Sequence, residues 1–121
     1  MFLHVRLKVR DLERSIAFYT QHFDFSLRRR KSTPRGSQLA FLAMEGTPTE
    51  IELAYLPWDP DFHVDEDILH LAFSVPDIQE AVARLRAAGV PITEEPMQLG
   101  GGTWIAFVED PDGYEIELIA H

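Results

Sequence analysis

Hydrophobic and polar positions along the chain first follow the spacing of a strand and then that of a helix. Residues 2–9 (FLHVRLKV) alternate between apolar and polar side chains, which predicts a β-strand. Apolar residues then recur at helical spacing from Leu12 to about His22, and Asp11 stands directly before them as a suitable N-cap. Three further strands are predicted, at residues 25–30, 37–44 and 49–56, so the first half has the order βαβββ.

The second half repeats this order. Residues 68–75 (ILHLAFSV) predict a strand, Asp77 is placed to cap a helix, and Gly89 is placed to end it. Two short strands are predicted near residues 90–93 and 96–99. A hairpin follows across the turn sequence DPDG, with strands at 103–110 and 114–120.

A linker is predicted between the two halves, because residues 57–67 are rich in proline and aspartate. The expected fold class is therefore α+β, with two tandem βαβββ modules at about 1–56 and 67–121. The length suits one domain spanning 1–121.

An internal repeat supports this division. Each half contains, in the same order, a strand histidine, a capped helix, the dipeptide Ala-Phe and the tetrapeptide EIEL. The matching pairs are His4 with His70, Asp11 with Asp77, 40–41 with 106–107, and 50–53 with 115–118. The offset is 66 residues for the first three pairs and 65 for the last.

The repeat makes four residues equivalent in pairs: His4 with His70, and Glu52 with Glu117. A lone strand histidine or glutamate is usually a structural or solvated residue. Two modules related by pseudo-twofold symmetry, however, could bring all four side chains to one point. Imidazole nitrogens and carboxylate oxygens suit zinc, nickel, cobalt, iron or manganese. The chain has no cysteine, so we expect a five- or six-coordinate ion with open positions for a substrate.

Composition excludes several other classes. The net charge of −9 argues against a nucleic-acid-binding protein. No apolar run is long enough to span a membrane, and no export signal is recognisable, so we expect a cytoplasmic protein. The charge is uneven: residues 1–36 carry nine Lys and Arg against three acids, a net of +6. The run Arg28–Lys31 is either a solvated strand or a patch that attracts an anionic small molecule.

The paired modules, with one histidine and one glutamate each, resemble the vicinal oxygen chelate superfamily, whose fold is that of glyoxalases, bleomycin resistance proteins and dioxygenases. The closest branch is glyoxalase I, the lactoylglutathione lyase. The segments that carry the resemblance are HVRLKVRDLERSIAFY, IELAY, LHLAFSV and GGGTWIAFVEDPDGYEIEL. The resemblance implies a curved mixed sheet around a metal site, with the metal ligands at His4, Glu52, His70 and Glu117.

The resemblance also implies a reaction, methylglyoxal detoxification. A hemithioacetal of a 2-oxoaldehyde and glutathione would be isomerised to a 2-hydroxyacyl thioester, with Glu117 as the main base and Glu52 as its partner. The ligand set and short length resemble bacterial enzymes activated by nickel or cobalt, while zinc, manganese or iron would also suit the ligands. Small chains of this branch commonly form homodimers, in which His4 and Glu52 of one chain meet His70 and Glu117 of the other.

Three positions depart from the branch's expected glutathione contacts. Lys8 stands where an arginine is expected, Leu56 where an asparagine is expected, and Leu99 where a lysine is expected. Lys8 keeps the positive charge but loses the bidentate fork, so it remains a candidate substrate-binding residue. Trp104 is a second candidate, as a wall of the substrate pocket.

Other functions remain open on these residues. The same enolising chemistry could act on another substrate, as in an acyl-thioester epimerase. An extradiol dioxygenase or antibiotic-modifying enzyme would use two His and one Glu, and the carboxylate of Glu52 argues against them. A metal-free protein that sequesters a small molecule is the alternative from a different class.

Overall fold

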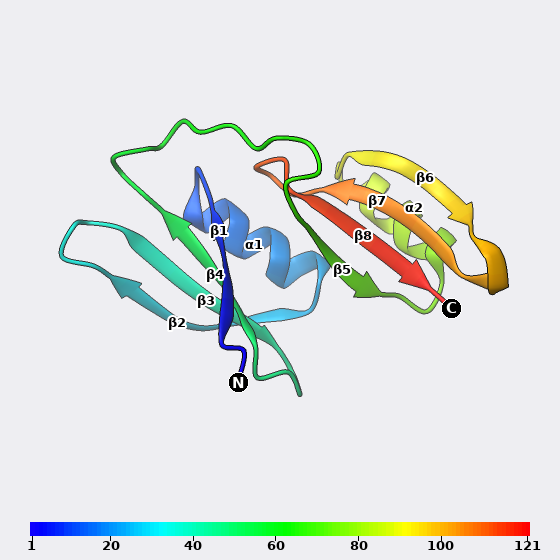
Figure 1. The fold of residues 1–121 in the computed structure, drawn as a ribbon, viewed down its shortest axis with the longest axis horizontal. Helices are drawn as coiled ribbons and strands as arrows, with labels where there is room; N and C mark the ends of the chain where they lie inside the picture. The colour runs from blue at the N-terminus through cyan, green and yellow to red at the C-terminus, as the bar shows by residue number, and fades with distance from the viewer. The chain divides into compact units, whose positions relative to one another are not determined.

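The computed structural model describes all residues, 1–121, and they form two compact units, 1–63 and 64–121 (Figure 1). The division falls inside the predicted linker, a few residues beyond the first predicted module. That the two modules make one domain stays a prediction.

The first unit has the predicted order βαβββ. Its elements are β1 (His4–Lys8), α1 (Leu12–His22), β2 (Phe25–Ser32), β3 (Gln38–Met44) and β4 (Glu50–Tyr55). The sheet order is β1-β4-β3-β2, with β1 parallel to β4 and the other pairs antiparallel. Asp11 caps α1 as predicted, because its side chain accepts a hydrogen bond from the backbone N–H of Arg14 at 3.1 Å.

The second unit repeats the plan. Its elements are β5 (His70–Ser74), α2 (Ile78–Ala87), β6 (Ile92–Gln98), a short 3₁₀ turn (Gly100–Gly102), β7 (Trp104–Glu109) and β8 (Glu115–Ala120). The sheet order is β5-β8-β7-β6, again with the first pair parallel. Asp77 caps α2 through the N–H groups of Gln79 and Glu80, at 3.0 and 3.2 Å. The fold class predicted from the sequence, two βαβββ modules, is confirmed.

Strand β6 differs from the prediction of two short strands. It is one strand, Ile92–Gln98, whose pairing with β7 shifts register twice. The second shift, between Glu94 and Met97, contains Pro96, which has no N–H to donate to a neighbouring strand. Because β6 lies at the edge of its sheet, the proline interrupts the pairing without ending the strand.

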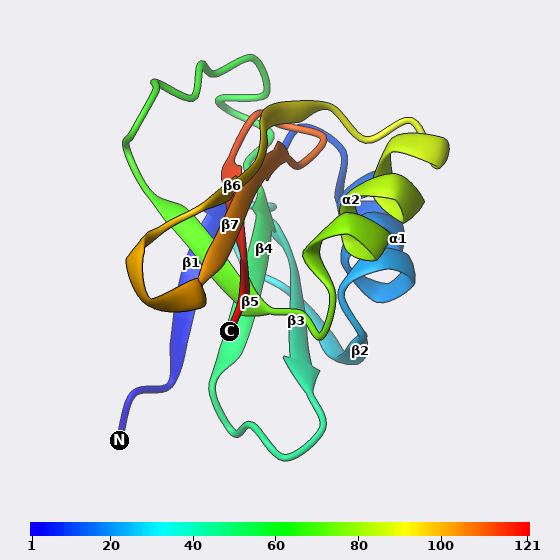
Figure 2. The same ribbon diagram turned by 90° about the vertical axis from the view of Figure 1, so that its right-hand side faces the viewer.

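Each helix covers one face of its own sheet (Figures 1 and 2). In the first unit, the strand register places Leu7, Leu53 and Ala40 side by side, and all three are fully buried. The intervening positions Arg6 and Glu52 therefore point to the opposite face. The helix thus covers one face of the sheet, while the other carries Arg6 and Glu52 beside the apolar Phe41.

The same alternation holds in the second unit. Ile116 and Leu118 of β8 are fully buried, whereas Glu115 and Glu117 are only partly buried. The buried residues of β7, Ala106 and Val108, lie beside them. Neither helix is long and apolar enough to cross a membrane.

The turn DPDG positions β8 through a buried side chain. Asp110 is 4% exposed, and its carboxylate accepts hydrogen bonds from the N–H groups of Asp112 and Tyr114, both at 2.9 Å. These bonds fix the path of the backbone immediately before the strand that carries Glu117.

We therefore expect Asp110→Ala to lower the free energy of unfolding by about 1–3 kcal/mol, because it leaves two buried N–H groups without acceptors. Urea denaturation followed by circular dichroism measures the change. Glu94→Ala, on the exposed edge strand, is the control and should change stability by less than about 0.5 kcal/mol. Equal effects of the two substitutions would contradict this role of the turn.

Candidate metal centre

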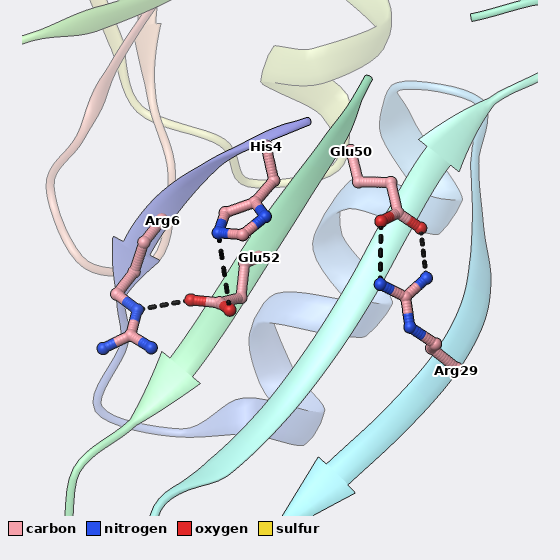
Figure 3. A network of polar contacts seen from close by, with 5 residues as sticks. All are labelled: His4, Arg6, Arg29, Glu50 and Glu52. Carbon is pink, nitrogen blue, oxygen red and sulfur yellow. Dashed lines mark hydrogen bonds and ion pairs between the residues drawn. The ribbon is translucent and has the colours of Figure 1, made fainter. Parts of the chain in front are cut away.

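His4 and Glu52 lie together on the face of the first sheet that α1 does not cover (Figure 3). The parallel register of β1 and β4 places Arg6 beside Glu52, so His4 is diagonal to the glutamate on the same face. His4 Nε2 lies 3.7 Å from Glu52 Oε1. The ring of Phe41, on the next strand, meets the His4 ring edge-on at 5.9 Å between centroids. The histidine is thus supported by an aromatic ring while its Nε2 faces the carboxylate.

His70 and Glu117 repeat this arrangement in the second unit. His70 Nε2 lies 3.2 Å from Glu117 Oε1. The ring of Phe107 meets the His70 ring edge-on at 5.7 Å. Phe107 occupies the same register position beside Glu117 as Phe41 occupies beside Glu52. Each unit therefore carries the same three-residue arrangement of histidine, glutamate and phenylalanine.

The structure brings the four predicted ligands together as two pairs. Neither unit groups three or more His, Cys, Asp or Glu side chains in a way that could hold a metal ion. Each pair offers one imidazole nitrogen and one carboxylate oxygen, and two such pairs make a donor set that suits a divalent transition metal. The four residues therefore fit a metal as two half-sites, and their union in one site stays a prediction.

The two candidate substrate residues lie differently. Lys8 is on the same face as His4 and Glu52, where its ammonium pairs with the carboxylate of Asp59 and lies 4.8 Å from the ring centre of Phe62. Trp104 is in register with Ala120 and alternates with Phe107, which places it on the opposite face of its sheet from Glu117. Within its unit, Trp104 therefore does not line the face that carries the half-site.

The basic run Arg28–Lys31 is partly neutralised within the first unit. Arg29 forms a two-pronged ion pair with Glu50 at 2.7 and 3.0 Å, and Arg30 forms one with Glu13 at 2.6 and 2.7 Å. The Arg30 pair lines a cavity of about 360 Å³ beside the start of α1, which none of the four predicted ligands lines. Two of the four cations in this run are thus held by carboxylates of the chain.

Two features of the half-sites were not predicted from the sequence. The ring beneath each histidine was detectable, because the Ala-Phe dipeptide belongs to the repeat. The ion pair of Arg6 with Glu52 was not detectable, because Arg6 has no counterpart in the second half, where Ala72 stands in its place. Nothing in the residue pattern distinguishes Arg6 from the other cations of the first strand.

Comparison with known proteins identifies the family. Residues 1–118 match the model of the glyoxalase/bleomycin resistance protein/dioxygenase superfamily. The chain belongs to this superfamily. Its sequence is 45% identical to the lactoylglutathione lyase of Salmonella typhimurium, over 97% of this chain and 90% of that protein. It is 40% identical to the lactoylglutathione lyase GLX1 of Arabidopsis thaliana, of whose length the match covers only 43%.

Solved structures of glyoxalase I have the same fold. The trypanothione-dependent enzyme of Leishmania major superposes with a TM-score of 0.83 at 37% identity, over 99% of this chain and 86% of that one. Glyoxalase I of Zea mays superposes with a TM-score of 0.85 at 35% identity, over 99% of this chain and 44% of that one. The resemblance and the fold expected from the sequence are both confirmed.

The Arg30–Glu13 pair gives a pH-dependent prediction. Hydrogen bonds from the Arg30 guanidinium hold the pKa of Glu13 below its ordinary value. Because this pKa is lowered, the pair stabilises the fold at pH values above the ordinary pKa of glutamate. This stabilisation is lost as the pH falls through the lowered pKa. In Arg30→Met, we expect the Glu13 pKa to return upward, as measured by NMR titration of its carboxyl carbon. Arg29→Met should leave the Glu13 titration unchanged, and a shift there would contradict the assignment.

Proposed function

We propose that this protein is a metal-dependent lactoylglutathione lyase of the glyoxalase I type. Its substrate would be the hemithioacetal formed from methylglyoxal and glutathione, and its product a 2-hydroxyacyl thioester. The observation that carries the proposal is the duplicated pairing of histidine with glutamate on the sheet faces that the helices do not cover, in a chain 45% identical to a lactoylglutathione lyase.

The four side chains His4, Glu52, His70 and Glu117 would hold one divalent ion, with nickel or cobalt favoured. When bound, the ion supplies Lewis-acid polarisation of two substrate oxygens, which acidifies the hydrogen on the adjacent carbon. Because each unit contributes two donors, we propose that two chains pair as a homodimer. His4 and Glu52 of one chain would then complete a site with His70 and Glu117 of the other.

Glu117 is the proposed proton carrier. Its carboxylate takes the proton from the hydroxyl-bearing carbon of the hemithioacetal and delivers one to the neighbouring carbon, so the reaction is an isomerisation with no net change in atoms or electrons. The Glu117 side chain is 17% exposed, against 5% for Glu52, so it is the more accessible of the two carboxylates. Glu52 would act mainly as a ligand.

Lys8 is the proposed contact for a carboxylate of the thiol. It lies on the same face as the first half-site, and its ammonium already forms an ion pair with Asp59. Leu56 packs against the apolar cluster of Leu39, Phe41 and Ala54, which would give the bound thiol an apolar neighbour instead of an amide. The charge of Lys8 and the apolar character of Leu56 together define the proposed thiol subsite.

A metal-by-substrate assay tests the function. Protein from which a chelator has removed bound metal should regain activity on methylglyoxal and glutathione when it is reloaded with nickel or cobalt. Activity is measured as the increase in absorbance of the thioester product. Absence of turnover with every divalent metal, in protein that retains the metal, would dismiss the lyase assignment.

Glu117→Gln should lower kcat about 10²–10⁴-fold, because the amide cannot accept the proton. The matched control is Glu115→Gln on the same strand and face, whose carboxylate accepts only from the backbone N–H of Asp67 at 3.0 Å. Steady-state kinetics of both variants make the comparison. A Glu117→Gln enzyme with kcat close to that of the control would remove Glu117 from this role.

Lys8→Ala should raise KM roughly tenfold and change kcat much less, because a charge-assisted contact to the bound thiol is lost. Arg84→Ala on α2 removes a cation that pairs with Glu80 at 3.9 Å, and it should leave KM unchanged. An unchanged KM in Lys8→Ala would exclude Lys8 from substrate binding.

A further inference from the structure

The two half-sites differ in the residue beside the glutamate. Arg6 is the register partner of Glu52 on β1, whereas Ala72 is the register partner of Glu117 on β5. The histidines, glutamates and phenylalanines of the two units match, so this position is where the repeat departs from symmetry within the half-sites.

Arg6 and His4 divide the two oxygens of Glu52 between them (Figure 3). Arg6 Nε donates a hydrogen bond to Oε2, while His4 Nε2 faces Oε1 at 3.7 Å. The Glu52 side chain is 5% exposed, so water contributes little to its solvation and the guanidinium supplies most of the compensation for burying the charge. The carboxylate is therefore held at one oxygen and directed toward the histidine with the other.

Glu117 has no such restraint. Its Oε1 faces His70 Nε2 at 3.2 Å, its side chain is 17% exposed, and no lysine or arginine contacts it. The methyl group of Ala72, in the position of Arg6, can neither donate a hydrogen bond nor carry a charge. The Glu117 carboxylate thus lacks the arginine that holds the second oxygen of Glu52.

The other glutamate of β4 has an arginine partner of its own. Glu50, two residues earlier on β4, is bound by Arg29 from β2 through both of its oxygens, at 2.7 and 3.0 Å (Figure 3). Each glutamate of this strand therefore has its own arginine. Arg29 offers a comparison for Arg6, because it has the same charge and lies on the same face but binds a carboxylate that is not a proposed ligand. Its guanidinium also lies 4.1 Å from the ring centre of Phe41, a contact that a methionine side chain can keep.

This inference rests on the metal site proposed above. We propose that Arg6 is a positioning residue that fixes Glu52 as a ligand binding through Oε1 alone. A partner that orients a ligating carboxylate strengthens metal binding, since the ligand need not be ordered when the ion arrives. A competing role, in which the guanidinium occupies the place of the ion, fits the geometry less well because Arg6 takes the oxygen that does not face His4.

The test compares Arg6→Met with Arg29→Met. The dissociation constant of Co²⁺ is measured by competition with a chelator, in full-length protein and without substrate. We expect Arg6→Met to weaken Co²⁺ binding about 10–100-fold, as for loss of an outer-shell partner. Arg29→Met should leave the affinity unchanged. Arg6→Lys should recover only part of the affinity, because an ammonium lacks the fixed geometry of the guanidinium.

A double-mutant cycle with Glu52→Ala separates positioning from a general loss of stability. If Arg6 acts through Glu52, Arg6→Met should have no further effect on Co²⁺ affinity once Glu52 is alanine. The visible absorption spectrum of the bound Co²⁺ should also change in Arg6→Met, because the freed carboxylate can bind through both oxygens.

Equal or tighter Co²⁺ binding by Arg6→Met would overturn the proposal, as would equal losses in Arg6→Met and Arg29→Met. These outcomes are distinct from failure of the proposed function, because they are measured by binding alone. The expected affinities in a protein without lyase activity would leave the role of Arg6 standing and remove the function. Lyase activity together with unchanged Co²⁺ affinity in Arg6→Met would leave the function standing and remove the role of Arg6.

Discussion

The parallel pairing of the first and last strand of each module is the constraint on which the candidate site depends. In both units the strand that precedes the helix lies beside the last strand of the module. Paired residues on these two strands are more than 40 positions apart in the sequence. This pairing sets a histidine diagonally across from a glutamate on the open face. A shift of one residue in either register would turn the glutamate toward the buried face under the helix. The buried apolar residues that alternate with these side chains, such as Leu7 and Leu118, fix the register. They therefore position the histidine–glutamate pairs as well as forming the core.

Most of the fold could be predicted because the same pattern of strands and helix occurs in both halves of the sequence. Asp11 and Asp77 predict the starts of the two helices, and each caps its helix in the structure. The sequence predicts two short strands where the structure has the single strand β6. The reason is that the sequence does not reveal that β6 is at an edge of its sheet, where Pro96 is tolerated. The sequence also does not reveal which face of a strand carries the site. The strand of Trp104 was predicted, but its side chain lies on the face away from Glu117.

The candidate site was predictable to the extent that it is symmetric. Comparing the two halves predicts His4, His70, Glu52 and Glu117 as ligands. The structure places them as two histidine–glutamate pairs, and their role as ligands stays a prediction. Arg6 was not found, because residues that distinguish one copy from the other give no signal in a repeat. Ion pairs between distant strands depend on register and side-chain direction, and these properties follow from the three-dimensional fold. The sequence therefore predicts what the two modules share better than how they differ.

The position of the basic run has a consequence for self-association. Strand β2 is the outer strand of its sheet, and one side of its backbone has no partner strand within the unit. An exposed strand edge is a template on which another extended chain can add. Consecutive positive charges at Arg28–Lys31 oppose this, because a second copy of β2 would bring its own cations alongside. Arg29 and Arg30 are paired with Glu50 and Glu13, so the charge that opposes such an addition comes mainly from Arg28 and Lys31.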